Sequence, residues 1–138
     1  MGKREQMIST IKKYLRNCYT SSSVYVYGNI PKDKYLNACG AYAGNVDYNN
    51  VFGLIDETLF GSAKTGMLFT DKGYYSDTSS GGEFNPYKDC TTFKSLPSGY
   101  NVVAFNELVT ALYEIETDPS GLDIAIGILD TVLDLLDD

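Results

Sequence analysis

Residues 66–76 have the sequence Gly66-Met67-Leu68-Phe69-Thr70-Asp71-Lys72-Gly73-Tyr74-Tyr75-Ser76, which is the pattern of a β-hairpin. Two runs rich in aliphatic and aromatic residues flank a short polar segment, and such runs favour paired strands joined by a turn. Gly73 is expected to take the positive φ of a three-residue loop, because glycine adopts that backbone region without steric cost. The hairpin therefore predicts an antiparallel sheet in the middle of the chain.

Further strands are expected on both sides of this hairpin. Residues 24–27 are β-branched or aromatic throughout, and residues 51–60 have the composition of a strand. Two short strands are expected at 91–93 and 101–104. Residues 77–90 are rich in Ser, Gly, Asn, Asp and Pro, which predicts an exposed loop. The sheet is thus predicted to contain about four to six short strands.

Helices are expected towards both ends of the chain. Apolar residues recur at helical spacing over residues 3–20, and Pro31 is well placed to begin a second helix. Asn106 is expected to cap a third helix, and Asp118-Pro119 to begin a last one. This order predicts an α+β fold, with an antiparallel sheet and helices at both chain ends. The 138 residues are expected to form a single domain.

The absence of histidine excludes several classes of enzyme. Without it the chain has no Ser-His-Asp or Cys-His catalytic pair and no His-ligated metal. Cys18, Cys39 and Cys90 have no C-x-x-C spacing and are expected to be buried, reduced thiols, which is typical of a cytoplasmic protein. Neither a signal peptide nor an apolar run of membrane-spanning length is recognised. We therefore predict a non-enzymatic, cytoplasmic protein without a cofactor.

Charge is distributed unevenly along the chain. Eleven basic and 18 acidic residues give a net charge of -7. Residues 1–64 have a balance of +3, residues 65–138 have a balance of -10, and no basic residue follows Lys94. Direct binding to nucleic acid is disfavoured, because neutralising phosphates requires a basic surface.

The acidic residues concentrate in a predicted helical segment, residues 106–138. In its last helix one face carries the carboxylates of Asp123, Asp130, Asp134 and Asp137, opposite an apolar stripe. Like charges four residues apart repel, and carboxylates near the carboxyl end of a helix oppose its dipole. Local stability therefore does not favour this arrangement.

Two interpretations of the acidic segment stay open at the level of sequence. It is either a solvated face, or one paired within the molecule with the basic face of the first helix, formed by Lys12, Lys13 and Arg16. Alternatively, it is an acidic surface presented to a basic partner.

The second interpretation predicts a non-catalytic interaction protein that docks its acidic surface on a basic surface of another protein. A nucleic-acid-binding enzyme is one such partner, because a carboxylate stripe imitates the charge of nucleic acid. The analogy is with phage and mobile-element inhibitors that mimic nucleic-acid charge. The predicted partner-binding residues are Glu114, Glu116, Asp123, Asp130, Asp134, Asp137 and Tyr87. Self-association through the apolar stripes of the last helices stays an alternative.

Residues 54–75 resemble the core of small bacterial PH-like (GRAM-like) domains. The shared features are the turn Phe60-Gly61-Ser62 and a hairpin of the form G-h-L-h-T-D-x-G-h-h at residues 66–75, where h is apolar or aromatic. The resemblance implies a non-catalytic binding scaffold with further strands and a closing helix, and it transfers no ligand and no site residues. It adds an alternative function, a module that binds a peptide or lipid through its sheet and Ser/Gly-rich loop, around residues 74–87.

Overall fold

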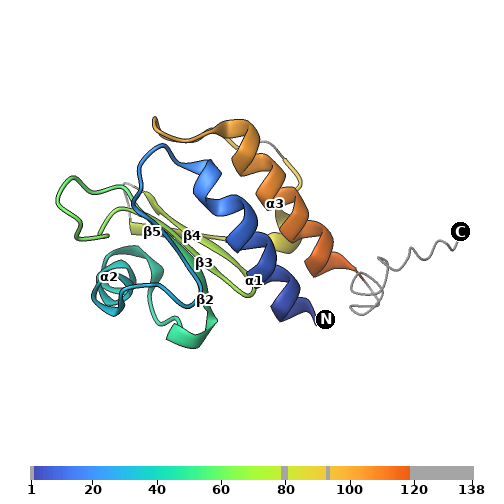
Figure 1. Cartoon of the computed structure of the whole chain (residues 1–138), viewed down its shortest axis with the longest axis horizontal. Coiled ribbons are helices and arrows are strands. Elements are labelled where there is room, and N and C mark those ends of the chain that lie inside the picture. Colours follow the sequence, from blue (N-terminus) through green and yellow to red (C-terminus); the bar gives the residue numbers. More distant parts are fainter. Residues whose placement is uncertain (1, 79–80, 93, 119–138) are drawn as a thin grey trace, which may run out of the picture.

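The computed structural model describes residues 2–78, 81–92 and 94–118. It contains a five-stranded antiparallel sheet that lies between two layers of helices (Figure 1). The α+β class, the number of strands and the helices towards both ends of the chain are confirmed.

The sheet is a meander in which each strand pairs with the next one in the chain. In sheet order the strands are β1 (Val24–Val26), β2 (Val51–Asp56), β3 (Gly66–Thr70), β4 (Gly73–Thr78) and β5 (Gly81–Pro86). Strands β2 and β3 are buried along their whole length. Continuous burial is expected of central strands that are covered by helices on both faces.

The predicted β3–β4 hairpin is present, with a tighter turn than expected. Phe69 pairs with Tyr74, and the turn between the strands contains only Asp71 and Lys72. Gly73 lies in β4 and does not have a positive φ, so that prediction is wrong. Glycine is needed there for space, because a Cβ atom would lie 2.5 Å from the carbonyl oxygen of Asn85.

The prediction of a loop over residues 77–90 is also wrong. Strand β5 and a 3₁₀ turn, Tyr87–Asp89, occupy most of this segment. Strand β5 is an edge strand that contains two glycines, an exposed Glu83, Asn85 and Pro86, so its composition is that of a loop. Of the two strands expected after it, neither forms among the described residues: Asn101 precedes a helix, and Tyr100 makes only an isolated bridge to Tyr19.

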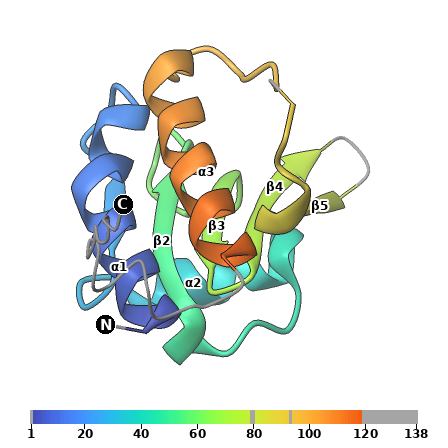
Figure 2. The ribbon, with the colours of Figure 1, turned by 90° about the vertical axis from the view of Figure 1, so that its right-hand side faces the viewer.

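Two antiparallel helices cover one face of the sheet. They are α1 (Lys3–Tyr14), extended by a 3₁₀ turn at Leu15–Cys18, and α3 (Val102–Thr117) (Figures 1 and 2). The Lys3 ammonium donates to the backbone oxygen of Glu116 at 2.9 Å, which joins the start of α1 to the end of α3.

Helix α3 begins earlier than predicted. Asn101 is its N-cap, with a side-chain oxygen that accepts from the Ala104 amide at 3.1 Å. Asn106 lies inside the first turns and donates to the Val102 carbonyl. The β-branched pair Val102-Val103 had suggested a strand, but the cap satisfies a free amide of the first turn and favours the helix.

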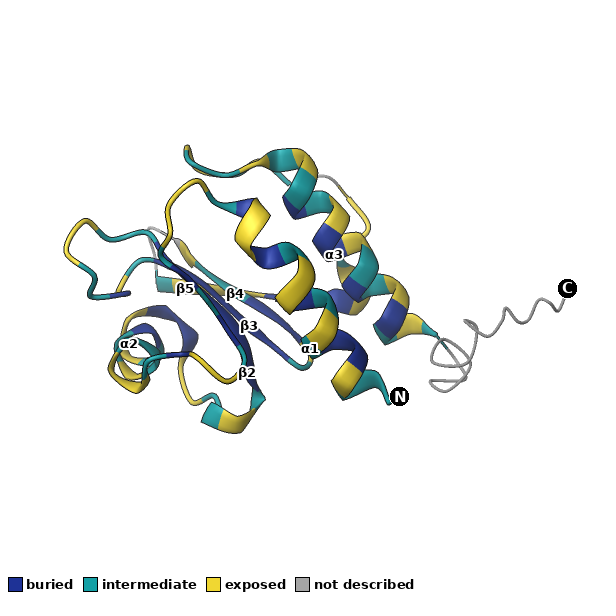
Figure 3. Cartoon of the chain, in the orientation of Figure 1, coloured by how far each residue is buried: buried dark blue, intermediate teal, exposed yellow. Residues whose placement is uncertain are grey.

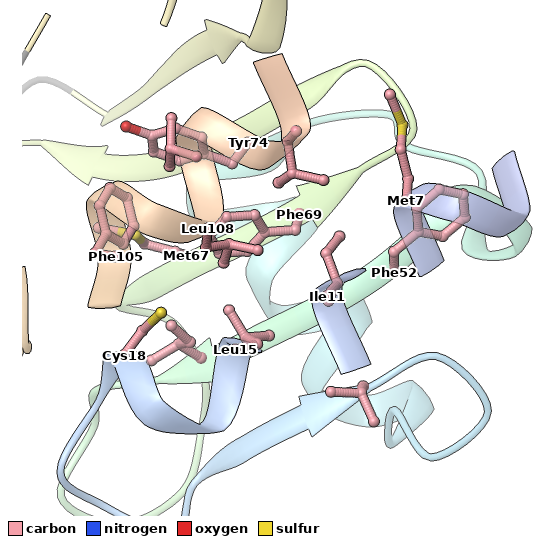
Figure 4. Close-up of a cluster of buried hydrophobic side chains, with 14 of the residues drawn as sticks. Met7, Ile11, Leu15, Cys18, Phe52, Met67, Phe69, Tyr74, Phe105 and Leu108 are labelled. Atoms are coloured by element: carbon pink, nitrogen blue, oxygen red, sulfur yellow. The ribbon is translucent and has the colours of Figure 1, made fainter. Parts of the chain in front are cut away.

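Helix α2 (Lys32–Ala38) lies on the other face of the sheet and continues as a π-helical turn, Cys39–Ala43. The helices carry exposed residues on their outer sides, and the central strands β2 and β3 are buried between the helical layers (Figure 3). On the α1/α3 side the largest buried side chains include Met7, Ile11, Leu15, Phe52, Phe69, Phe105 and Leu108, several of which are drawn in Figure 4. A second cluster packs under α2 and contains Ile30, Ala38, Tyr42, Leu54, Ala63 and Leu68.

Candidate functional site

The predicted acidic surface is described as far as Asp118, on the outer side of α3. Glu114 is exposed. Glu116 is half-buried, and its carboxylate lies 3.8 Å from the Lys72 ammonium. The other predicted carboxylates, Asp123, Asp130, Asp134 and Asp137, lie outside the described residues, as does most of the segment 106–138.

Glu107 and Glu114, two helical turns apart, line a shallow depression of about 430 Å³ on this outer face. Its remaining lining residues are Val103, Asn106, Thr110 and Ala111. Val103 is 69% exposed, so the depression combines an exposed apolar side chain with two carboxylates.

Within the described part of the chain, these carboxylates are not paired with the basic face of α1. Glu107 and Glu114 take part in none of the ion pairs there. Lys12, Lys13 and Arg16 are exposed, and Arg16 donates instead to the Val24 carbonyl at 3.0 Å. Glu107 and Glu114 therefore remain available to a partner.

Tyr87 does not belong to a docking surface. Its side chain is fully buried, and its hydroxyl donates to the Thr70 carbonyl at 2.7 Å. Burial raises the pKa of this tyrosine well above its usual value, so the hydroxyl stays protonated. The sequence prediction of Tyr87 as a contact residue is corrected: it follows the edge strand directly and faces the core.

A second candidate site is a groove between β4–β5 and the segment that leads into α3. It consists of two adjoining cavities of about 370 and 320 Å³, and both are lined by Tyr74, Lys94 and Ser95. Such volumes lie at the lower end of the range for ligand sites, about 300–1,000 Å³. The first cavity reaches α3 at Phe105, and the second reaches the end of β2 at Glu57.

Carboxylates outnumber cations along this groove. The acidic lining residues are Glu57, Asp77, Glu83 and Asp89, and the basic one is Lys94. The Lys94 ammonium lies 3.1 Å from a Glu83 oxygen and also donates to the Asn85 side-chain oxygen. Glu57 accepts a hydrogen bond from the Tyr100 hydroxyl at 2.5 Å, and burial together with Glu57 raises the pKa of Tyr100.

Tyr74 lines both cavities. Only 2% of the residue is exposed, yet its hydroxyl has no hydrogen-bond partner among the described residues. Figure 4 shows the hydroxyl at the end of the ring that points away from Phe69. Burial, with Cys90 and Glu83 nearby, raises the pKa of Tyr74, so this group is a neutral hydroxyl that can still donate and accept.

A third feature is the loop between β2 and β3, which holds two large apolar residues in solvent. Leu59 and Phe60 are 88% and 94% exposed. The loop is braced by buried polar contacts: Lys34 pairs with Asp56 at 2.8 Å and donates to the Gly61 carbonyl. Asp56 and Glu57 thus point to opposite sides of the sheet, as their adjacency in the sequence predicts.

The groove was only partly visible in the sequence. The PH-like resemblance pointed to residues 74–87, which contribute one wall. Glu57 and Lys94 come from distant segments with no shared spacing, so nothing in the sequence connected them.

Two kinds of site are not found in the part of the chain that the structure describes. No group of three or more His, Cys, Asp or Glu side chains there is arranged to hold a metal ion. No helix among these residues has the length and apolarity to cross a bilayer.

Comparisons with protein-family models, curated proteins and solved structures find no match to this chain. The resemblance to PH-like domains therefore stays a prediction.

Proposed function

We propose that the protein is a non-catalytic interaction protein that docks the acidic outer face of α3, together with the acidic segment that follows it, on a basic surface of a partner protein. One observation carries the proposal. Glu107 and Glu114 are exposed, are unpaired among the described residues, and line one depression together with an exposed apolar side chain, Val103.

The physical argument concerns what such a face can complement. Carboxylates beside an apolar strip match a surface on which Lys or Arg flank aliphatic side chains. The charges accelerate encounter and select the partner, while burial of apolar area supplies about 25 cal/mol per Å². Proteins that bind nucleic acid carry basic surfaces of this kind, and docking on one would inhibit it by occupying its phosphate-binding surface.

Capture from an extract of the native host tests the proposal. The full chain is immobilised, and proteins retained at low and at high salt are identified. We expect basic proteins whose retention falls steeply with salt, because the screening length shortens from ~10 Å at 0.1 M to ~3 Å at 1 M. Glu107→Lys with Glu114→Lys should abolish retention, and Asp130→Lys with Asp134→Lys should do the same.

The matched control reverses the charge at two acidic residues outside α3. Glu5→Lys with Asp33→Lys changes the net charge by the same amount, and both residues are exposed on other helices. The control should retain the partner. If the control and the α3 variant lost the partner equally, the change in net charge alone would explain the loss, and the proposal would be contradicted.

The groove favours a second candidate function. A module that binds a peptide through its sheet, as the PH-like resemblance implies, would use the groove beside β4–β5. The unpartnered Tyr74 hydroxyl and the aromatic lining support a peptide ligand.

A further inference from the structure

Cavities whose walls carry several carboxylates exclude anions and attract cations. The cavity at the β2 end of the groove is lined by Glu57, Asp77 and Glu83, with Lys94 as its basic residue. A net excess of two carboxylates remains after Lys94 is counted. A phosphate or carboxylate ligand is therefore disfavoured in this cavity, and a cationic one is favoured.

The cavity also has an apolar side. Met67, Leu96 and Pro97 line it together with the Tyr74 ring. A ligand that suits both sides carries its charge at the end of an aliphatic stem. Lysine and arginine side chains have this construction, because apolar methylene groups separate the charged group from the backbone.

A buried polar group independently points to a ligand. Tyr74 lines the cavity, only 2% of the residue is exposed, and its hydroxyl makes no hydrogen bond to the described residues. An ammonium or guanidinium group can donate to it. Lys94 is an example of an ammonium group held in this groove. It donates to Glu83 and Asn85 at the junction of the two cavities.

From these observations we infer that the Glu57–Asp77–Tyr74 end of the groove is a receptor for a Lys or Arg side chain of a partner protein. The inference rests on the second candidate function and names the chemistry that the groove selects. It does not depend on docking through α3.

An NMR titration of the isotopically labelled full chain tests it with defined probes. The first probe is a short Gly/Ser peptide with blocked ends and one central Lys, the second has Arg there, and the third has norleucine, which keeps the stem without the charge. The Lys and Arg peptides should cause saturable shifts at Glu57, Asp77 and Lys94. The norleucine peptide should bind at least tenfold more weakly.

Substitutions separate binding from folding. Glu57→Gln with Asp77→Asn should weaken binding of the Lys peptide at least tenfold. Tyr74→Phe should weaken that binding severalfold, while the NMR spectrum stays that of the folded protein. Lys94→Met should tighten binding, because it removes the competing cation; a merely structural role for Lys94 predicts no gain.

The outcomes distinguish the two proposals. Glu107→Lys with Glu114→Lys should leave peptide binding unchanged. Equal binding of the norleucine peptide in the groove would overturn the inference and leave a peptide-binding module. Shifts confined to α3, or no shift with any probe, would overturn it as well. Spermidine binding tenfold tighter than the Lys peptide would assign the cation to a free polyamine and contradict a protein partner.

Discussion

At the scale of single residues, Lys34 and Asp56 determine the geometry of the β2–β3 loop. The Asp56 carboxylate is fully buried, and besides Lys34 it accepts from the Thr58 amide and hydroxyl. Burial acts to raise the pKa of Asp56, but the hydrogen bonds from Lys34 and Thr58 outweigh it and lower the pKa. The hydrogen bond to Asp56 raises the pKa of Lys34, so both shifts indicate an ion pair.

We predict that Lys34→Met lowers the free energy of unfolding by about 3 kcal/mol, because it leaves a buried carboxylate without its cation. Urea unfolding measures the loss. Lys64→Met, which removes an exposed lysine of the same loop, should cost less than about 0.5 kcal/mol. Equal effects of the two substitutions would contradict a special role for Lys34.

The pair also sets a pH dependence. Asp56 has a lowered pKa in the folded state, so its contribution is present above its unfolded value of about 3.9 and is lost as the pH falls through the folded value. Lys34 has a raised pKa, so its contribution is present below about 10.4 and is lost as the pH rises through the folded value. The difference between wild type and Lys34→Met should therefore be largest near neutral pH and shrink below about pH 4.

Tyr42 and Tyr87 form a natural comparison. Both are buried, but the Tyr42 hydroxyl has no hydrogen-bond partner among the residues that the structure describes, whereas that of Tyr87 donates to Thr70. We predict that Tyr42→Phe leaves stability unchanged or raises it by up to about 1 kcal/mol, while Tyr87→Phe lowers it by about 1–2 kcal/mol. Thermal or urea unfolding of the two variants decides this, and a larger loss for Tyr42→Phe would contradict the structure.

At the scale of elements, the start of α3 shows what the sequence can and cannot predict. The residue pattern predicts Asn106 as the cap and a strand at residues 101–104, whereas Asn101 is the N-cap in the structure. The choice depends on tertiary contacts: the Asn101 amide donates to the Cys18 carbonyl and joins the end of the first helix to the start of the last described one. That contact joins residues far apart in the chain, and no local pattern encodes it.

We predict that Asn101→Ala lowers the free energy of unfolding by about 1 kcal/mol, since the cap for the Ala104 amide is lost. Asn106→Ala should cost less, because its side chain only bonds to a carbonyl inside the helix. Chemical denaturation of the two variants checks the order, and the reverse order would place the helix start at Asn106.

The sheet and the groove differ in how far neighbouring residues in the sequence determine them. The β3–β4 hairpin follows from residue types along eleven consecutive positions, and it was predicted. Strand β5 was missed because an edge strand that contains two glycines, Glu83, Asn85 and Pro86 has the composition of a loop. The groove was largely missed, because it forms only when Glu57, Tyr74 and Lys94 meet across the fold.

At the scale of the whole molecule, the uneven charge persists in three dimensions. Helices α1 and α3 lie side by side, one with exposed basic residues and the other with exposed Glu107 and Glu114, and these groups do not pair among the described residues. Neighbouring surfaces of opposite sign that leave each other unpaired are available to external partners. The groove contributes a second acidic surface beside β4–β5.

The salt dependence of affinity for a captured partner tests the central claim most directly. The dissociation constant is measured by calorimetry over a series of salt concentrations, for the wild-type chain, for Glu107→Lys with Glu114→Lys, and for Glu5→Lys with Asp33→Lys. We predict a steep weakening with salt for the wild type and the control, and at least a tenfold weaker and flatter response for the α3 variant. An affinity independent of salt, or one unchanged in the α3 variant, would contradict docking through the acidic face of α3.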